Sequence, residues 1–165
     1  MAGPFQLEAD LTNEESVPPG FERPYPPETE PAPGAVFDTL DGRSTWRQAD
    51  SDISGLLNLR GLFAHTDNVV AYARGVLEAP RAGDVRLGIG SNDGARLWIN
   101  GQLVYSQHVS RAGSKRDDEV TVPVHKGANT ILAKVENLGL GWKLYLSIYD
   151  PDRIYSFVSG TDGSP

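Results

Sequence analysis

The 165-residue sequence contains no cysteine, which excludes disulfides, thiolate metal sites and a cysteine nucleophile. No apolar run approaches the roughly 20 residues that a membrane-spanning helix needs, so no membrane span is expected. The sequence also lacks a GxSxG nucleophile elbow and a P-loop. Its three histidines, His65, His108 and His125, do not have the spacing of metal ligands. No predicted strand places a carboxylate in an apolar pocket, where a shifted pKa would be expected. These absences predict that the protein is not an enzyme.

Over most of the chain, acidic and basic residues are nearly balanced. The net charge is −7, but residues 1–35 hold seven acidic residues and a single arginine. Residues 36–165 hold 15 acidic and 14 basic residues and are therefore nearly neutral. A nucleic-acid partner is not expected, because such partners require a concentration of positive charge.

The first four residues lack a basic region followed by an apolar run, so they predict no signal peptide. On this pattern alone, either the protein is intracellular or its signal has been removed.

Proline is concentrated at the N-terminus, where residues 1–35 hold eight of the 12 prolines. Proline removes amide donors and disfavours helix before it, so we expect an extended, acidic, Pro-rich arm or solvated linker. Phe5, Leu7, Ala9 and Leu11 alternate within this arm. They indicate a strand that would add to the edge of its own sandwich or to that of a neighbour.

The rest of the chain shows the period-2 alternation of half-buried strands. Asn100-Gly101 fits a two-residue hairpin, since both residue types tolerate positive φ. The stretch from Gly42 to Phe63 is ambiguous between a short helix and irregular edge structure. Seven or eight short strands at near-regular spacing predict an all-β, antiparallel sandwich over residues 36–150, followed by a C-terminal tail over 151–165. The inward positions are Val85, Leu87, Ile89, Leu97, Ile99, Val120, Val122, Val124, Ile131, Ala133, Val135, Leu144, Leu146 and Ile148.

Residues 69–149 resemble the galactose-binding-like jelly-roll modules of multidomain bacterial proteins and glycan-degrading enzymes. The resemblance rests on Tyr72-Ala73, LGIGSNDGARLWING over 87–101, KGANTILAKVEN over 126–137, and Gly141-Trp142. The central stretch also resembles the middle of the PA14-type sandwich. The resemblance implies a jelly-roll fold and an extracellular or cell-surface location. It further implies that the module binds carbohydrate or packs against a neighbouring catalytic domain.

The turn at Asn92-Asp93 is the first candidate site. In PA14-like lectins a neighbouring pair of aspartates in this loop helps to hold a calcium ion that binds sugar hydroxyls. The resemblance therefore implies calcium as a candidate cofactor here, with Asn92 replacing the first aspartate and removing one negative charge. The alternative is that Asp93 and Ser91 hydrogen-bond the backbone of the turn itself.

Trp142 follows a glycine-rich loop and is the candidate platform for a sugar ring, with Asn137 and Lys143 close in sequence. The alternative is that its indole caps the end of the sandwich core. Trp98 is expected on an outward strand face, either in a flat binding surface or packed beneath the N-terminal arm or another domain.

The longest polar insertion runs from Ser106 to Glu119. Arg111 and Arg116 would form bidentate hydrogen bonds to a carboxylate, such as that of a uronic acid. The alternative is a solvated loop with local Arg–Asp pairs.

The leading hypothesis is a non-catalytic carbohydrate-binding or accessory module of a larger extracellular protein. A structural subunit is the alternative, with residues 1–35 docking on identical subunits or neighbouring domains by strand addition. The predicted ligand-binding residues are Asn92, Asp93, Arg111, Asp117, Asn137, Trp142 and Lys143, of which Asn92 and Asp93 would hold the metal.

Overall fold

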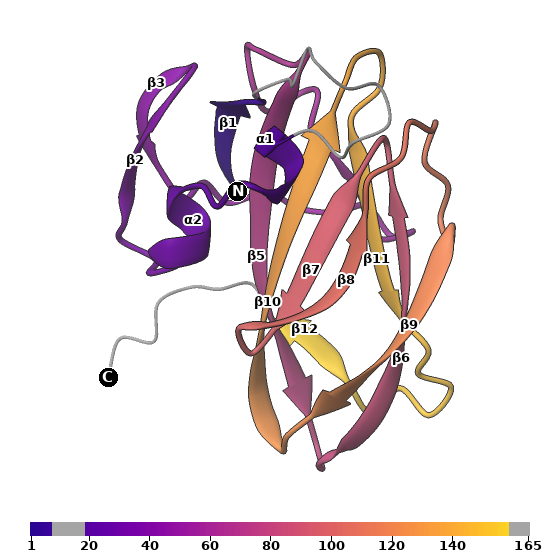
Figure 1. The fold of residues 1–165 in the computed structure, drawn as a ribbon. Helices are drawn as coiled ribbons and strands as arrows, with labels where there is room; N and C mark the ends of the chain where they lie inside the picture. Colours follow the sequence, from indigo (N-terminus) through magenta and orange to yellow (C-terminus); the bar gives the residue numbers. More distant parts are fainter. Residues whose placement is uncertain (8–18, 159–165) are drawn as a thin grey trace.

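Two antiparallel β-sheets face one another in the computed structural model, which describes residues 1–7 and 19–158 (Figure 1). One sheet has the order β1-β5-β10-β7-β8, with β12 also paired to β5, and the other has the order β4-β11-β6-β9. A separate hairpin joins β2 to β3. The elements are β1 (Ala2–Gln6), α1 (Pro19–Glu22), α2 (Pro26–Thr29), β2 (Val36–Thr39), β3 (Gly42–Thr45), β4 (Leu56–Asn58), β5 (Val69–Ala79), β6 (Gly83–Ser91), β7 (Ala95–Ile99), β8 (Gln102–Gln107), β9 (Asp118–Val124), β10 (Gly127–Asn137), β11 (Lys143–Ile148) and β12 (Ser156–Val158).

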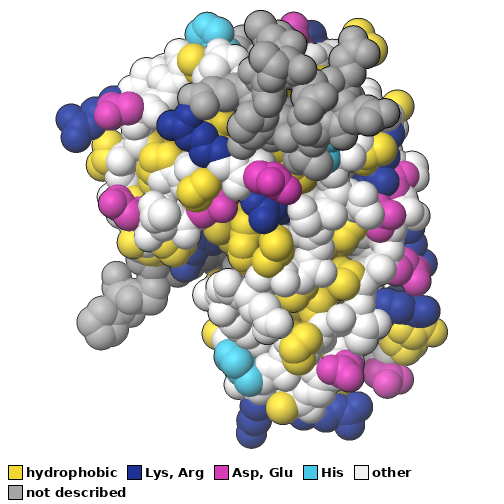
Figure 2. Space-filling model, viewed as in Figure 1, with side chains coloured by type: hydrophobic (Ala, Val, Ile, Leu, Met, Phe, Trp, Pro, Cys, Tyr) yellow, Lys and Arg dark blue, Asp and Glu magenta, His cyan; other side chains and the backbone are white. Residues whose placement is uncertain are grey.

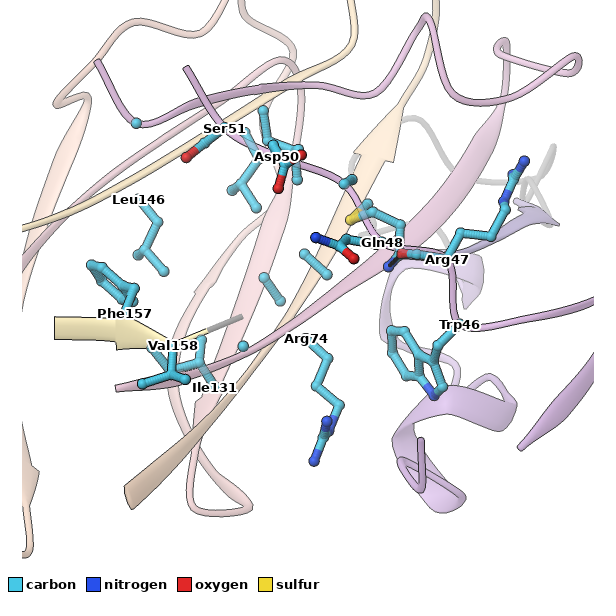
Figure 3. A pocket seen from close by; sticks show the side chains of 18 of the residues that line it. Trp46, Arg47, Gln48, Asp50, Ser51, Arg74, Ile131, Leu146, Phe157 and Val158 are labelled. Carbon is cyan, nitrogen blue, oxygen red and sulfur yellow. Dashed lines mark hydrogen bonds between the residues drawn. The ribbon is translucent and has the colours of Figure 1, made fainter. Parts of the chain in front are cut away.

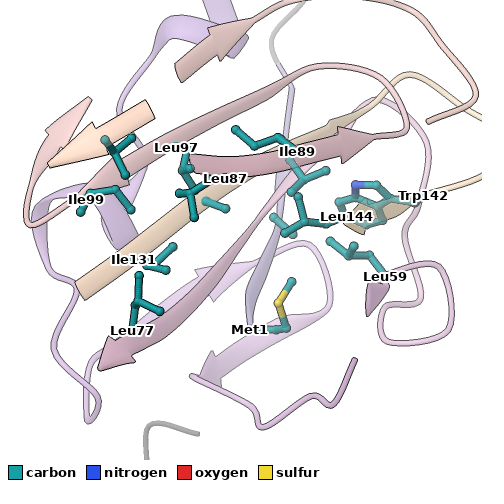
Figure 4. Close-up of a cluster of buried hydrophobic side chains, with 14 of the residues drawn as sticks. Met1, Leu59, Leu77, Leu87, Ile89, Leu97, Ile99, Ile131, Trp142 and Leu144 are labelled. Carbon is teal, nitrogen blue, oxygen red and sulfur yellow. The ribbon is translucent and has the colours of Figure 1, made fainter. Parts of the chain in front are cut away.

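The predicted all-β antiparallel sandwich is confirmed. Strand alternation places Leu97 and Ile99 of β7 inside, together with Ile131 of β10, while Trp98 lies on the opposite face. Aliphatic side chains from both sheets meet in one continuous core (Figure 4). All the positions predicted to point inward belong to this core or pack against it.

The Asn100-Gly101 hairpin is also confirmed. Asn100 has a φ of 51° and Gly101 a φ of 79°, the left-handed conformations that a tight hairpin requires. The Asn100 side chain ties the turn to β10, since its Oδ1 accepts a hydrogen bond from the Thr130 amide at 2.9 Å.

The N-terminal region packs against the sandwich. β1 pairs with β5 of the same chain, so the described part of the predicted alternation adds to its own sheet edge. Phe5 and Tyr25 are buried with Tyr72 of β5 and Phe37 of β2 in a second apolar cluster. The structure here differs from the solvated-linker interpretation, because packing these aromatic side chains together removes a large apolar surface from water. Ala9 and Leu11 lie outside the described residues.

The ambiguous stretch before β5 holds two short strands, β3 and β4, and irregular connections. At the other end β12 pairs with β5 beyond the last long strand, so part of the tail joins the sheet. The helices in the described part, α1 and α2, have four residues each, far fewer than a membrane crossing requires.

Candidate functional site

Trp142 lies inside the core and is 0% exposed. Its ring packs against Phe63 with the centroids 5.4 Å apart, and its carbonyl accepts a hydrogen bond from the Leu59 amide at 3.0 Å. The platform hypothesis for Trp142 is therefore corrected, since a fully buried indole presents no face to a sugar. The physical reason is that β4 and Phe63 close over the end of the sandwich, where an indole fills the space, as the alternative interpretation expected.

Asp93 holds the turn between β6 and β7. One carboxylate oxygen accepts a hydrogen bond from the Arg111 amide at 3.2 Å, and the other accepts one from the Leu138 amide at 2.7 Å. Ser91 Oγ donates to the Asp93 carbonyl at 2.7 Å. These contacts match the structural interpretation of this turn, in which its polar side chains bind backbone.

The donor set of this turn does not fit calcium. Both carboxylate oxygens of Asp93 are engaged by amides, and Asn92 is almost fully buried. Within residues 1–7 and 19–158, no three His, Cys, Asp or Glu side chains cluster closely enough to hold a metal. A calcium site takes six to eight oxygen ligands and favours several carboxylates, whereas this turn offers one carboxylate that already accepts two backbone hydrogen bonds.

The Arg111 side chain forms ion pairs within its own loop. Its Nη1 lies 2.8 Å from Asp118 Oδ2 and its Nε lies 3.4 Å from Asp117 Oδ2. Burial raises the pKa of Asp118, but hydrogen bonds from Tyr105 and Arg111 outweigh it and hold the pKa below its usual value. The guanidinium is thus committed to the loop's own carboxylates, the alternative interpretation, rather than held open for a uronic acid.

The polar loop lies tightly against the end of β6. A Cβ at Gly90 would fall 1.6 Å from the Ser114 carbonyl oxygen, and a Cβ at Gly113 would fall 2.3 Å from the Ser91 carbonyl carbon. Only glycine permits such an approach of two backbones.

The remaining predicted ligand residues do not complete an open site. Asn137 is fully buried and its side-chain amide donates to the Thr66 carbonyl. Lys143 is half-buried at the start of β11. The structure thus gathers Asn92, Asp93 and Arg111 into one scaffold that fixes the loops.

A groove that the predicted site residues do not include lies on the outer face of the six-stranded sheet. It has a volume of about 830 Å³, within the range of ligand pockets. One wall comes from α2 and the segment after it, and the floor comes from β5, β7 and β10. In Figure 2 the surface is hollowed between the block that carries α2, on the left, and the strands of the sandwich. The lining residues that carry hydrogen-bonding or ring groups are Glu28, Thr29, Glu30, Arg74, Trp98 and Thr130.

Trp98 is the aromatic side chain of this groove. It is half-buried on the outer face of β7, as the alternation predicts. The Arg96 guanidinium lies 5.3 Å from the Trp98 ring centroid and donates to the Glu22 carbonyl at 3.1 Å. Arg96 therefore orients the indole from the arm side by a cation–π contact.

The wall formed by α2 is fixed by a buried lysine. Lys134 Nζ donates to the Arg23 carbonyl at 2.7 Å and to Glu28 Oε1 at 3.2 Å, and it lies 4.7 Å from the Tyr25 ring centroid. The Tyr72 hydroxyl donates to the same Glu28 oxygen. Burial lowers the pKa of Lys134 to about 8, although the Glu28 carboxylate opposes the shift.

A second buried charge on the same face of β10 is Glu136. Its Oε2 lies 2.8 Å from His108 Nδ1, and its Oε1 has no hydrogen-bond partner within the described residues. Burial raises the pKa of Glu136, against the lowering influence of His108.

Comparisons with known proteins bear on the sandwich. Residues 56–132 match the family model of the PA14 domain, which confirms the predicted PA14 resemblance over that stretch. No curated protein sequence matches the chain.

Among solved structures, one similar chain is an anti-sigma factor domain-containing protein from Clostridium clariflavum. It is 15% identical with a TM-score of 0.45, over 57% of this chain and 31% of that one, so the chain spans about a third of its length. A family 35 carbohydrate binding module from an environmental isolate is 16% identical with a TM-score of 0.42, over 55% of this chain and 72% of that one. A beta-glucosidase from Kluyveromyces marxianus, solved with glucose, is 11% identical with a TM-score of 0.42, over 74% of this chain and 14% of that one.

Proposed function

We propose, from the premise that residues 56–132 are a PA14 domain, that the protein is a non-catalytic carbohydrate-binding or accessory module of a larger extracellular or cell-surface protein. The observation that carries the proposal is the groove of about 830 Å³ lined by the half-buried Trp98. The proposed sugar site thus lies on the outer sheet face, away from Trp142.

The chemistry of the groove suits a sugar. Pyranose rings have apolar C–H faces that stack on an indole, and Trp98 supplies one on a rigid strand. The Thr130 hydroxyl, the Glu30 carboxylate and the Arg74 guanidinium line the same groove and supply hydrogen bonds to ring hydroxyls. Each such bond replaces one to water, so the expected affinity is roughly micromolar to millimolar.

The alternative assembly role has less support. β1 pairs with β5 of its own chain, and α1 and α2 contact the same sandwich. An arm engaged in this way favours the binding module over a subunit that docks on its neighbours.

The test is a glycan and polysaccharide screen of the intact protein, followed by titration of the best ligand into variants. Trp98→Ala should weaken binding at least tenfold. Tyr149→Ala removes an exposed aromatic that lines neither this groove nor the cavity beside Gly75, and should leave binding unchanged. A chelator should have no effect, because both Asp93 carboxylate oxygens already accept backbone hydrogen bonds that hold the turn. Undiminished binding by Trp98→Ala would reject the groove, and binding abolished by chelator would restore the calcium hypothesis.

A further inference from the structure

A second cavity opens between the two sheets at the outer edge of β5 (Figure 3). Its volume is about 540 Å³, which also lies in the range of ligand pockets. Apolar side chains from both sheets line its floor, and the segment 46–51 borders its mouth. The apolar lining includes Leu57, Ala73, Ile131, Ala133, Leu144 and Leu146.

Small residues on the inner face of β5 create this cavity. Ala71, Ala73 and Gly75 occupy successive inward positions where a sandwich core ordinarily carries larger side chains. A Cβ built on Gly75 meets no atom within 4 Å, so the space beside it is open. The sequence itself therefore removes the side-chain volume that would close the slot.

The edge of β5 is also incomplete beside the cavity. β1 pairs with β5 as far as Tyr72, and β12 pairs with it from Val76 onward. Within the described residues, Ala73 to Gly75 has no strand partner on this side. The gap spans roughly 10 Å, and the ends of both flanking strands face it, so it is too short for an added peptide strand. A small molecule fits such an opening better.

The groups at the mouth favour a neutral ligand. In Figure 3 the amide of Gln48 points toward the apolar side chains, whereas the guanidinium groups of Arg47 and Arg74 point away from them. Phe157 and Val158 form an exposed apolar part of the rim, being 47% and 43% exposed. Arg47, Asp50 and Arg74 border the slot, but within the described residues no charged side chain lies among the apolar residues of its floor. A charged ligand would lose hydration between the sheets without gaining a counter-ion there, whereas a neutral apolar ligand would not.

We propose that this slot binds a neutral, apolar small molecule that carries one hydrogen-bonding group at the Gln48 end. The ligand's apolar body would lie between the sheets against Ile131 and Leu146. The slot and the Trp98 groove share Arg74 and Ile131 as lining residues but lie on opposite faces of the six-stranded sheet, so the two proposals can fail independently.

The test uses 1-octanol as the probe and follows amide chemical shifts of the full isotope-labelled chain by NMR. We expect saturable shifts confined to residues around Leu57, Ala73–Gly75, Ile131–Ala133 and Leu144–Leu146. Octanoate at neutral pH should bind at least tenfold more weakly than octanol. Shifts that are absent, or scattered over other surfaces, would overturn the proposal.

Gly75→Leu fills the slot and should weaken octanol binding at least tenfold. Gly61→Leu is the matched control, because a Cβ at Gly61 also meets nothing within 4 Å and Gly61 lines neither cavity. If Gly75→Leu does not fold, Leu146→Phe narrows the same slot and should give the same loss. Octanol binding unchanged in the filled variant would reject the site.

Two further measurements distinguish an internal slot from the glycan groove and from a dimer interface. Gly75→Leu should keep the glycan affinity of the native chain, because its side chain faces away from the Trp98 groove. Sedimentation should show a monomer. A dimer dissociated by Phe157→Ser would overturn the proposal, since a second copy would then cover the slot.

Discussion

The two faces of β10 both hold buried side chains, but of opposite polarity. Its inward residues, such as Ile131 and Val135, are aliphatic and join the core. Its outward residues, Lys134 and Glu136, are charged and yet equally buried, because the N-terminal region and the polar loop cover them. Nearer the Asn100-Gly101 hairpin the cover ends, and exposed Thr130 lines the groove. The inner face of β10 is therefore buried by apolar packing, and its outer face is buried by charged side chains that have partners. The ligand groove begins where the N-terminal region no longer covers the strand.

The strongest test of the inner face is Trp142→Ala. Removing a fully buried indole leaves a cavity, so the free energy of unfolding should fall by about 3–5 kcal/mol. Urea denaturation followed by circular dichroism measures this loss. A loss below about 1 kcal/mol would mean that the indole does not fill the end of the core.

On the outer face, Lys134→Met should lower the free energy of unfolding by about 2–3 kcal/mol, because the partly buried Glu28 carboxylate then lacks its cation. The double variant Lys134→Met, Glu28→Gln should recover part of this loss, since no charge is left unpaired. A double-mutant cycle in urea measures the coupling. Strictly additive effects would contradict the paired-charge account of this face.

The stability of the protein should rise with pH above pH 8, because burial lowers the pKa of Lys134 in the folded state. The folded chain releases the Lys134 proton near pH 8, whereas the unfolded chain holds it until about 10.5. Between these values the unfolded state binds more protons, so the free energy of unfolding should rise with pH, by about 1–2 kcal/mol from pH 8 to 10. The difference between the native chain and Lys134→Met isolates this contribution. A native curve that ran parallel to that of the variant would contradict it.

The smallest expected effect on stability is that of Trp98→Ala. The indole is half-buried and makes one cation–π contact with Arg96, so the free energy of unfolding should fall by about 1 kcal/mol or less. The same variant should show the largest loss of glycan binding. Thermal unfolding measured beside the glycan titration separates the two effects, and a large drop in stability would place Trp98 among core residues.

Local sequence patterns predicted much of the sandwich. The period-2 alternation identified the inward residues of β6, β7, β10 and β11, and Asn100-Gly101 identified a hairpin. These features depend on neighbours in sequence, and the backbone geometry of a strand or a tight turn translates them directly into structure.

Long-range contacts explain what the patterns missed. The local sequence Gly141-Trp142 does not distinguish an exposed indole from a buried one. The residues that cover it, Leu59 and Phe63, come about 80 residues earlier in the chain. Lys134 occupies an outward position that predicts exposure, but its partners Glu28 and Arg23 lie 106 and 111 residues away. The groove was missed for the same reason, since one wall comes from a proline-rich segment that carries no strand pattern.

The position of β11 has a practical consequence for anyone who wishes to produce this domain alone. The PA14 match stops at residue 132, yet β11 (Lys143–Ile148) lies between β4 and β6 in the four-stranded sheet. A gene trimmed to the matched residues would encode β4 without the strand that holds it, and would leave the flank of β6 unpaired. Such a fragment would offer an open strand to its copies and should collect in inclusion bodies. Expression boundaries are therefore better drawn from the sheet order than from the limits of a sequence match.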